Sequence, residues 1–333
     1  MNGKTLLFEG PGNVCHKPVT IGKPASGEVL VETHYSGISS GTEMLVYRGE
    51  VPEEMVVDTA IESLDGQFSY PLVYGYAVVG KVSDIGENVE RSWIDQRVFG
   101  FEPHRTAFIT KPELLVRLPE WLSGEVATLI PTFETATNLV IDSAPLVGER
   151  VVIFGAGPIG LATTSLLAEF PIELVVAEPI EARRQLARSF GADAAVEPSE
   201  AMSYFDEEEP AGADLAIEVS GEPGTLDNAI EALGYHGRII VGSWYGTKRA
   251  AIDLGRSFHR NDIRIRASQV TNISPDRLGR WTRKRRLSSA ISHLKQFDAS
   301  KMISHRISFE EAPMAYELLH RDNEAVQVIL TYT

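Results

Sequence analysis

The sequence is nearly without cysteine, since Cys15 is the only one in 333 residues. One thiol excludes an internal disulfide, and it excludes zinc and iron–sulfur sites that take three or four thiolates from one chain. Positive charge is also scarce: 31 Lys and Arg face 46 Asp and Glu, which gives a formal net charge of −15. This balance argues against broad nucleic-acid binding.

Long hydrophobic runs are missing as well. The apolar stretch at the N-terminus is shorter than the seven to fifteen residues or so that a signal peptide needs, so we expect a cytoplasmic protein. Residues 151–168 carry no charge, but Gly155, Gly157, Pro158 and Gly160 divide them into a strand, a tight turn and a helix. We therefore do not expect this segment to cross a membrane.

The composition that is present is that of a globular α/β protein, with 43% hydrophobic and 23% charged residues. The length predicts about two domains. Residues 1–130 are interrupted by Gly and Pro at short intervals and favour a β-rich domain. Its expected strands lie at residues 5–9, 28–35, 72–83, 97–101 and 107–118.

Residues 131–287 show a different rhythm, in which short apolar strands alternate with helices, as in a doubly wound parallel sheet. The expected strands lie at residues 151–154, 173–178, 193–196, 214–220 and 238–244. Helices are expected at 180–190, closed by Gly191, and at 224–233, closed by Gly234. The tail, 288–333, carries two amphipathic helices (288–296 and 310–320) and an apolar strand at 325–332, and it is expected to complete the first domain.

A glycine-rich motif lies at the start of the second domain. Gly155, Gly157 and Gly160 form GxGxxG directly after the strand VVIF, and the motif includes Pro158 and Ile159 where a helix opens. In this pattern the first glycine makes the turn, the second lets a pyrophosphate approach the backbone, and the third lets helix and strand pack closely. The sequence therefore predicts a dinucleotide site at the start of the helix.

The end of the next strand favours NAD as the dinucleotide. Glu178 is placed to accept hydrogen bonds from the ribose hydroxyls, and its charge would repel a 2′-phosphate. NADP stays possible because Arg183 and Arg184 follow within the next helix and could pair with that phosphate.

Several longer stretches resemble the medium-chain dehydrogenase/reductase superfamily over nearly the whole chain. They are SGISSGTE at 36–43, YPLVYGYAVVGKV at 70–82, LVGERVVIFGAGPIGLA at 146–162, and ISFEEAPMAYELL with QVILTY near the C-terminus. The resemblance implies a GroES-like catalytic domain, a Rossmann domain, an active-site cleft between them and a homodimer or tetramer. The pattern SGISSGTE followed by GYA is most similar to the branch that contains bacteriochlorophyllide a dehydrogenase.

The resemblance also shows where this chain departs from zinc-dependent members. Their first cysteine corresponds to Ser39 or Ser40, their His-Glu pair to Tyr76 and Ala77, and their later Cys or Glu to about Ile130. The lobe with four cysteines is missing. We therefore expect no metal and a zinc-independent enzyme.

A hydride transfer without zinc needs a side chain that gives or takes the proton of the substrate oxygen. The resemblance places five polar residues near that position, each with a structural alternative. Tyr76 is a proton donor or a core tyrosine, and Thr42 is a relay hydroxyl or a helix N-cap. Glu43 is a relay carboxylate or a first-turn charge, His104 is a relay or a solvated loop residue, and Glu134 is an acid/base group or a buried Glu held by its neighbours.

The segment after the strand RIIVGSW completes the expected cofactor site. By resemblance, the backbone of Val241, Gly242 and Ser243 contacts the nicotinamide carboxamide. Trp244 and Tyr245 either wall the substrate pocket or pack in the core.

Three functions remain open from the sequence. The first is an NAD(P)-dependent oxidoreductase that interconverts a secondary alcohol and a ketone, and the second is an NAD(P)H-dependent enone or quinone reductase. The third is a nucleotide-responsive binding protein without catalysis. The expected partner is a small-molecule alcohol or ketone, with no nucleic acid and no membrane.

One segment has the opposite charge to the rest. Residues 248–286 contain twelve Lys and Arg against three Asp. This segment is either a solvated helix face or subunit contact, or a docking surface for a phosphate or carboxylate.

Overall fold

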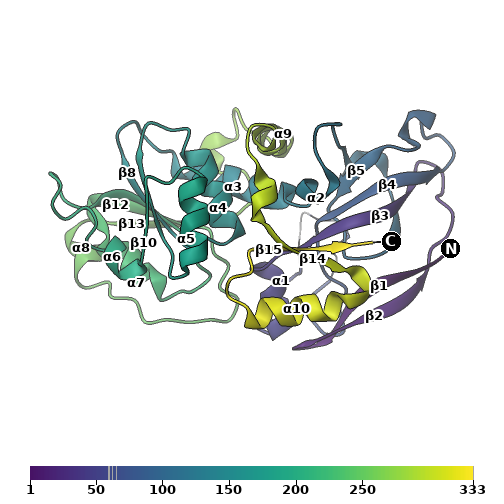
Figure 1. Ribbon diagram of the computed structural model, residues 1–333, viewed down its shortest axis with the longest axis horizontal. Coiled ribbons are helices and arrows are strands. Elements are labelled where there is room, and N and C mark those ends of the chain that lie inside the picture. Colours follow the sequence, from purple (N-terminus) through teal and green to yellow (C-terminus); the bar gives the residue numbers. More distant parts are fainter. Residues whose placement is uncertain (59–60, 62, 65, 333) are drawn as a thin grey trace. The chain divides into compact units, whose positions relative to one another are not determined.

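The computed structural model describes residues 1–332 except 59, 60, 62 and 65. The chain divides into two compact units, which Figure 1 shows with their labelled elements. Unit 1 comprises Met1–Pro131 and Asp298–Thr333, and unit 2 comprises Thr132–Phe297. The tail was expected to rejoin the first domain at residue 288, and it rejoins unit 1 at Asp298. The difference arises because α9 (Arg283–Leu294) is held in unit 2 by Arg286.

Unit 1 is built on a seven-stranded sheet with the order β14-β15-β3-β4-β5-β7, in which β6 also pairs with β3. These strands are β3 (Val29–Ile38), β4 (Val78–Ile85), β5 (Arg97–Gly100), β6 (Ala107–Thr110), β7 (Leu115–Arg117), β14 (Ile303–Ser308) and β15 (Gln327–Thr331). A separate hairpin joins β1 (Asn2–Gly10) and β2 (Asn13–Thr20). The tail of the chain therefore supplies two strands to the same sheet as the N-terminal segment, with Leu330 opposite Ser36.

Short helices complete unit 1. They are α1 (Thr42–Arg48), α2 (Gly124–Ala127) and α10 (Ala312–Arg321), with 3₁₀ turns η1 (Arg91–Trp93), η2 (Pro112–Leu114), η4 (Ala299–Met302) and η5 (Phe309–Glu311). The strand predicted at 72–83 begins only at Val78, because Gly75 has a φ of 112° that breaks the extended backbone before it.

Unit 2 is a six-stranded parallel sheet with the order β10-β9-β8-β11-β12-β13, the doubly wound arrangement expected from the alternating rhythm. The strands are β8 (Arg150–Phe154), β9 (Glu173–Ala177), β10 (Ala194–Val196), β11 (Ala213–Glu218), β12 (Leu233–Val241) and β13 (Arg264–Ala267). The uncharged run at 151–168 is divided between β8 and α4, and no helix in the described part of the chain is long and apolar enough to cross a membrane.

The helices of unit 2 form two groups around this sheet. α4 contacts α5, whereas α7 contacts both α6 and α8. The helices are α3 (Ile130–Ser143, which begins in unit 1), α4 (Pro158–Leu167), α5 (Glu181–Ser189), α6 (Pro198–Ala201), α7 (Thr225–Glu231), α8 (Ser257–Arg260) and α9, with the 3₁₀ turn η3 (Pro275–Arg277).

One expectation for unit 2 is wrong, and one strand had no expectation. Gly234 does not close a helix: α7 ends at Glu231 and β12 begins at Leu233, so Gly234 lies within the strand. β13 was not predicted, because Arg264–Ala267 is exposed at all four positions and does not read as a buried parallel strand.

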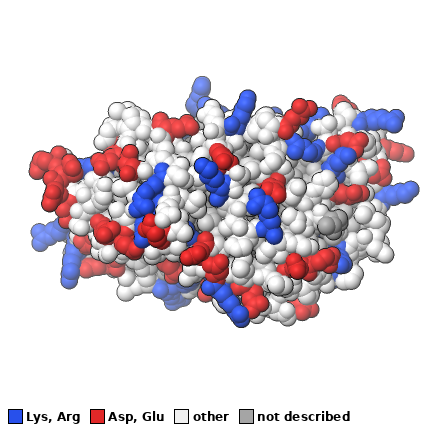
Figure 2. Space-filling view, viewed as in Figure 1, with Lys and Arg blue, Asp and Glu red and all other residues white. Residues whose placement is uncertain are grey.

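Charge of both signs is interspersed on the face of the molecule that Figure 2 shows. The basic segment 248–286 does not form one helix face, because it is spread over α8, β13, η3 and the start of α9. Arg286 is only 2% exposed, whereas Arg283 and Lys284 are exposed.

Candidate functional site

The glycine-rich turn of unit 2 has the geometry that its sequence predicts. Gly155 has a φ of 105°, and a Cβ there would lie 2.8 Å from the Cα of Ser220. A Cβ on Gly160 would lie 1.9 Å from the carbonyl oxygen of Gly155, so only glycine lets α4 pack this closely on the turn. A Cβ on Gly157 would meet nothing within 4 Å, so this position is open to a ligand.

The first turn of α4 faces this open position with unused donors. Gly157 is the N-cap and Pro158 is the first helical residue, which suits proline because that position needs no donor. Ile159 and Gly160 follow, and N–H groups in the first turn have no intrahelical acceptor. The turn can therefore hold an anionic pyrophosphate through backbone N–H groups and the positive end of the helix dipole.

Glu178 lies directly after β9 and is buried, with 3% of its surface exposed. Its Oε2 accepts a hydrogen bond of 2.7 Å from the N–H of Ala156, inside the glycine-rich turn. Its Oε1 accepts one of 3.1 Å from the N–H of Ile180. Each carboxylate oxygen keeps a lone pair for a ribose hydroxyl, so Glu178 can bind the sugar while it fixes the turn.

The two arginines considered for a 2′-phosphate lie on α5. Arg184 is engaged in ion pairs with Glu181 at 2.9 Å and with Glu197 at 2.5 Å. Its Nη1 also donates to the carbonyl oxygen of Glu178. These contacts hold Arg184 in place without a phosphate, and its neighbour Arg183 is on the same helix.

The segment at the end of β12 is tied to the end of β11. The N–H groups of Gly242 and Ser243 both donate to the carbonyl oxygen of Glu218, at 2.8 and 3.3 Å. The carbonyl oxygen of Val241 accepts from the N–H of Ser268, and Ser243 Oγ accepts 2.9 Å from the N–H of Gly221, so the Ser243 hydroxyl keeps its own proton for a carboxamide.

A buried carboxylate that the sequence did not single out lies at the same edge of the sheet. Glu218 is fully buried and accepts hydrogen bonds from Ser220 and, at 2.5 Å, from the hydroxyl of Tyr245. Burial first, and then the charge of Glu218, raise the pKa of Tyr245. Tyr245 is therefore held as a neutral phenol by Glu218. The position of Tyr245 directly after RIIVGSW gave no indication of this partner.

In unit 1 a buried polar chain converges on Glu43. This residue is in the first turn of α1, yet it has no exposed surface. Its Oε1 accepts a hydrogen bond of 2.9 Å from the N–H of Ser39. Its Oε2 lies 2.9 Å from both His104 Nε2 and the hydroxyl of Tyr316. Three donors therefore compensate the burial of this carboxylate, and it is not the solvated first-turn charge that was the alternative.

His104 extends this chain to the C-terminal strand. It is fully buried, so it is not a solvated loop residue, and its Nδ1 lies 2.7 Å from Ser36 Oγ. Ser36 Oγ is in turn 2.8 Å from the hydroxyl of Tyr332. Each link of hydroxyl and imidazole can both donate and accept, so the chain can pass a proton from one end toward Glu43.

Tyr76 and Thr42 lie beside the same carboxylate. Burial first, and then the negative charge of Glu43, raise the pKa of Tyr76, whereas hydrogen bonds with Ser39 and Thr42 lower it; the net pKa is about 12. Thr42 is the first residue of α1, and Gly41, not Thr42, is the N-cap. The structure thus brings Thr42, Glu43, Tyr76 and His104 together.

Glu134 has partners of its own. It lies on α3 in unit 2, where its Oε1 accepts from Arg286 Nε at 3.1 Å and from Arg286 Nη2 at 2.8 Å. The same guanidinium also bonds Asn138 Oδ1 and the carbonyl oxygen of Val270. A carboxylate held by a buried guanidinium serves as a structural partner, which agrees with the structural alternative given for Glu134.

The residues at the positions that the resemblance assigns to zinc ligands do not fit a zinc ion. Ser40, Tyr76, Ala77 and Ile130 supply no thiolate, imidazole or carboxylate there. Among the described residues no group of three or more His, Cys, Asp or Glu could hold a metal ion.

Sequence reasoning missed three polar partners of the buried chain: Ser36, Tyr316 and Tyr332. Each lies in a stretch that resembles the family, but nothing local marks it as a partner of Glu43 or His104. Tyr316 is 273 residues from Glu43, so only the return of the tail brings them together.

These features define a two-domain fold, with a GroES-like β-rich domain in unit 1 and a Rossmann domain in unit 2. Residues 158–282 match the family model described as "Zinc-binding dehydrogenase". The chain has the fold of the medium-chain alcohol dehydrogenases.

Two relatives illustrate the similarity. The starvation-sensing protein RspB of Escherichia coli is 23% identical over 99% of both chains, and (R,R)-butanediol dehydrogenase of Bacillus subtilis is 27% identical over 75% of this chain and 78% of its own. A crystal structure of 2R,3R-butanediol dehydrogenase from Bacillus subtilis has a TM-score of 0.79 at 21% identity, over 99% of both chains. One of RspB from Escherichia coli, in complex with NADH, has a TM-score of 0.78 at 21% identity, over 99% of both chains.

Proposed function

We propose that this protein is an NAD(P)-dependent oxidoreductase that interconverts a secondary alcohol and a ketone, with a preference for NAD and without catalytic zinc. The observation that carries the proposal is the glycine-rich turn with Glu178 bonded into it through Ala156. The relatives support the reaction class, since one is a butanediol dehydrogenase and another was crystallised with NADH.

The cofactor fits the residues that are present. Gly157, Ile159 and Gly160 would hold the pyrophosphate, and Glu178 would bind the ribose hydroxyls. A bound nicotinamide would supply the hydride acceptor or donor. Because Glu178 is negatively charged and Arg184 is already paired with Glu181 and Glu197, a 2′-phosphate would be disfavoured.

The proton chemistry belongs to the buried chain of unit 1. In ketone reduction the substrate oxygen needs a proton donor, and Tyr76 holds its proton because burial and the Glu43 charge raise its pKa to about 12. Thr42 and Ser39 orient the phenol, and the Ser39 N–H also donates to Glu43 Oε1, whose other oxygen contacts His104. Zinc independence is supported by the side chains at the zinc positions, which are poor zinc ligands.

The expected substrate is a small secondary alcohol or its ketone, and the expected assembly is a homodimer or a tetramer. We expect the protein to be located in the cytoplasm.

The test is a titration of chelator-washed protein with NADH and with NADPH, followed by a panel of ketones and enones. We expect NADH to bind more tightly, ketones to be reduced, and the metal content to stay far below one zinc per chain. Turnover of enones but not ketones would replace the proposed reaction by alkene reduction, and tight binding without any turnover would indicate a binding protein.

A variant makes the cofactor assignment specific. Glu178→Gln should weaken NADH binding by about tenfold or more and leave NADPH binding unchanged or stronger, because it removes a charged acceptor for the ribose. Glu173→Gln is the control, since Glu173 is exposed at the opposite end of β9. An unchanged NADH to NADPH ratio in Glu178→Gln would contradict the assignment.

A further inference from the structure

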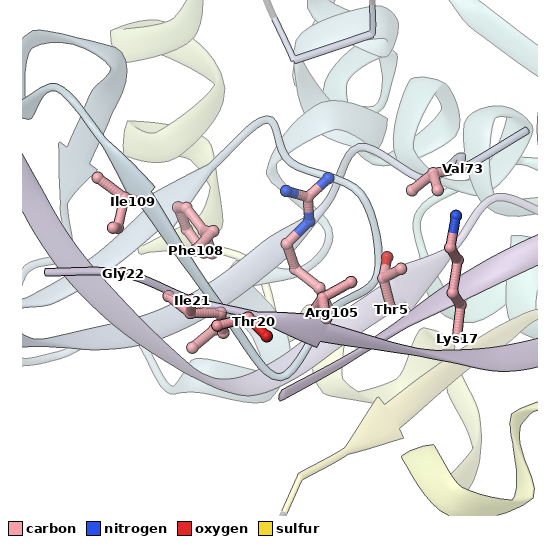
Figure 3. Close-up of a pocket in the computed structure, with 11 residues that line it drawn as sticks. Thr5, Lys17, Thr20, Ile21, Gly22, Val73, Arg105, Phe108 and Ile109 are labelled. Atoms are coloured by element: carbon pink, nitrogen blue, oxygen red, sulfur yellow. The ribbon is translucent and has the colours of Figure 1, made fainter. Parts of the chain in front are cut away.

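A cavity in unit 1 is lined by none of the residues that the proposed reaction uses, and its Thr5 donates a hydrogen bond of 3.1 Å to the carbonyl oxygen of His104. Its volume is about 360 Å³, and it is lined by the β1–β2 hairpin, the residues after β2, Val73, Arg105 and β6. This volume lies within the range of pockets that hold small organic molecules. Figure 3 shows the side chains around it.

The register of the backbone places two cations on either side of one threonine. Thr5 on β1 is opposite Lys17 on β2, and Thr5 also forms an antiparallel bridge with Arg105. Residues directly opposite each other in antiparallel pairs have side chains on the same face, and adjacent strands are about 4.8 Å apart. Lys17 and Arg105 therefore flank Thr5 on one face, and both line the cavity.

The guanidinium of Arg105 is poorly satisfied. The side chain is 29% exposed, and among the described residues the nearest carboxylate is Glu102 Oε2, which is 4.0 Å from Nη1. Its Nε is buried and has no hydrogen-bond partner. Arginine has five N–H donors in a planar fork, so this group has spare capacity for a bidentate acceptor.

Lys17 adds a second positive charge without a compensating acid. Its side chain is exposed, and no carboxylate in the described part of the chain lies within ion-pair distance of it. In a protein with a formal charge of −15, two cations that share a cavity with one acidic contact at 4.0 Å between them are a local exception.

The remaining walls are apolar. Ile21 and Ala107 are buried, and Val19 and Ile109 pack against them in one hydrophobic cluster. Val19 is two residues beyond Lys17 on β2, so both side chains are on the same face of the strand. The cavity therefore presents a charged end and an adjoining hydrophobic surface.

We propose that this cavity binds a small monocarboxylate with a compact branched or aromatic body. The carboxylate lies between Lys17 and Arg105 above Thr5, and the body lies against Val19, Ile21 and Ile109. A planar carboxylate matches the guanidinium fork, and the apolar wall favours an organic anion over an inorganic one.

The experiment measures binding of isovalerate and benzoate to the full-length protein without dinucleotide, by calorimetry or NMR titration. Isovaleramide and benzamide are neutral probes of the same shape, and inorganic phosphate is an anion without an apolar body. We expect the carboxylates to bind with a Kd of about 1 mM or tighter, and the amides and phosphate to bind at least tenfold more weakly.

Three variants locate the binding. Arg105→Met and Lys17→Met should each weaken carboxylate binding about tenfold or more, and Val19→Trp should block it by filling the apolar wall. Lys301→Met, at an exposed lysine on η4 of the same unit, is the control and should bind as the wild type does. Because Lys17 is exposed, Lys17→Met keeps the test valid even if Arg105→Met fails to fold.

Equal binding of carboxylates and amides, or wild-type affinity in Lys17→Met, would overturn the proposal. Phosphate that binds as tightly as the carboxylates would contradict the proposed contact with an apolar body. Unchanged carboxylate binding in Val19→Trp would contradict it too. None of these measurements needs a dinucleotide or turnover, so their outcome is independent of the proposed oxidoreductase activity.

Discussion

Glu43 is a carboxylate without exposed surface, and two of its three hydrogen-bond partners, His104 and Tyr316, come from distant parts of unit 1, whereas Ser39 is four residues away. A buried charge is tolerated only when donors replace the water that it loses. His104 and Tyr316 do so on one oxygen, and the Ser39 N–H does so on the other. At the residue scale, the candidate catalytic chemistry therefore depends on a carboxylate whose burial is compensated by hydrogen bonds.

Tyr76→Phe tests the proton donor. We expect kcat for ketone reduction to fall by about 10²–10⁴-fold, because a general acid is lost, while NADH affinity stays unchanged. Tyr74→Phe is the control, since the Tyr74 ring packs edge-on against Tyr76 in the core. A wild-type kcat in Tyr76→Phe would remove Tyr76 from the mechanism.

The raised pKa of Tyr76 also predicts a pH dependence. With a pKa of about 12, the phenol stays protonated through the neutral and moderately alkaline range. Ketone reduction in the wild type should therefore show no loss of the donor below about pH 11, whereas an ordinary tyrosine would titrate near pH 10. The measurement is kcat against pH under saturating cofactor, and a fall centred near pH 10 that is absent in Tyr76→Phe would contradict the assigned pKa.

At the scale of elements, the glycine-rich turn separates a structural glycine from a binding glycine. A Cβ on Gly160 would overlap the carbonyl oxygen of Gly155, so Gly160→Ala should lower the free energy of unfolding by about 1–3 kcal/mol. A Cβ on Gly157 would meet no protein atom within 4 Å and its φ is −71°, so Gly157→Ala should change stability by less than about 0.5 kcal/mol.

Gly157→Ala should affect cofactor binding rather than stability. Gly157→Ala should weaken NADH binding by tenfold or more, because the methyl group occupies the position that the pyrophosphate approaches. Urea unfolding and a fluorescence titration measure the two effects separately. Normal NADH binding by a folded Gly157→Ala protein would show that the open position does not receive the phosphates.

The ion pair between α3 and α9 explains why α9 belongs to unit 2. Arg286→Met would leave the Glu134 carboxylate, which is 8% exposed, without its main partner. We expect the free energy of unfolding to fall by about 3–5 kcal/mol, and the double variant Glu134→Gln with Arg286→Met to recover most of this loss. Arg283→Met is the exposed control, and an equal loss in the single and double variants would show that packing rather than charge is responsible.

At the scale of the whole molecule, β13 is the edge of the six-stranded sheet, because it pairs with β12 alone in the described sheet. Ile265 on this strand is 39% exposed. An exposed edge strand with an apolar side chain is open to pairing with another chain. The expected homo-oligomer therefore has a physical basis at β13.

Ile265→Lys tests this edge. We expect the wild type to sediment as a dimer or tetramer at micromolar concentration, and Ile265→Lys to weaken the association by about tenfold or more through like-charge repulsion and loss of apolar contact. Val147→Lys is the control, because Val147 is 83% exposed in the loop before β8. A monomeric wild type would contradict the expectation directly.

Much of unit 2 could be predicted from the sequence because its signals are local. The glycine-rich turn, its helix and Glu178 lie within 24 residues, and each glycine is required by a steric contact or a close approach that recurs wherever this motif occurs. The alternation of apolar runs likewise predicts buried parallel strands without reference to distant residues. β13 was missed because an exposed edge strand lacks that apolar signal.

The sequence by itself therefore determined the glycine-rich turn with its helix, and the β-rich and α/β halves of the chain. Only the tertiary structure decided which polar residues contact one another. His104 contacts Glu43, which is 61 residues away in the sequence, and Arg286 donates to Glu134, which is 152 residues away. The physical reason is that a buried charge is paired with whichever donor the packing brings to it, and that donor leaves no mark at its own position in the sequence.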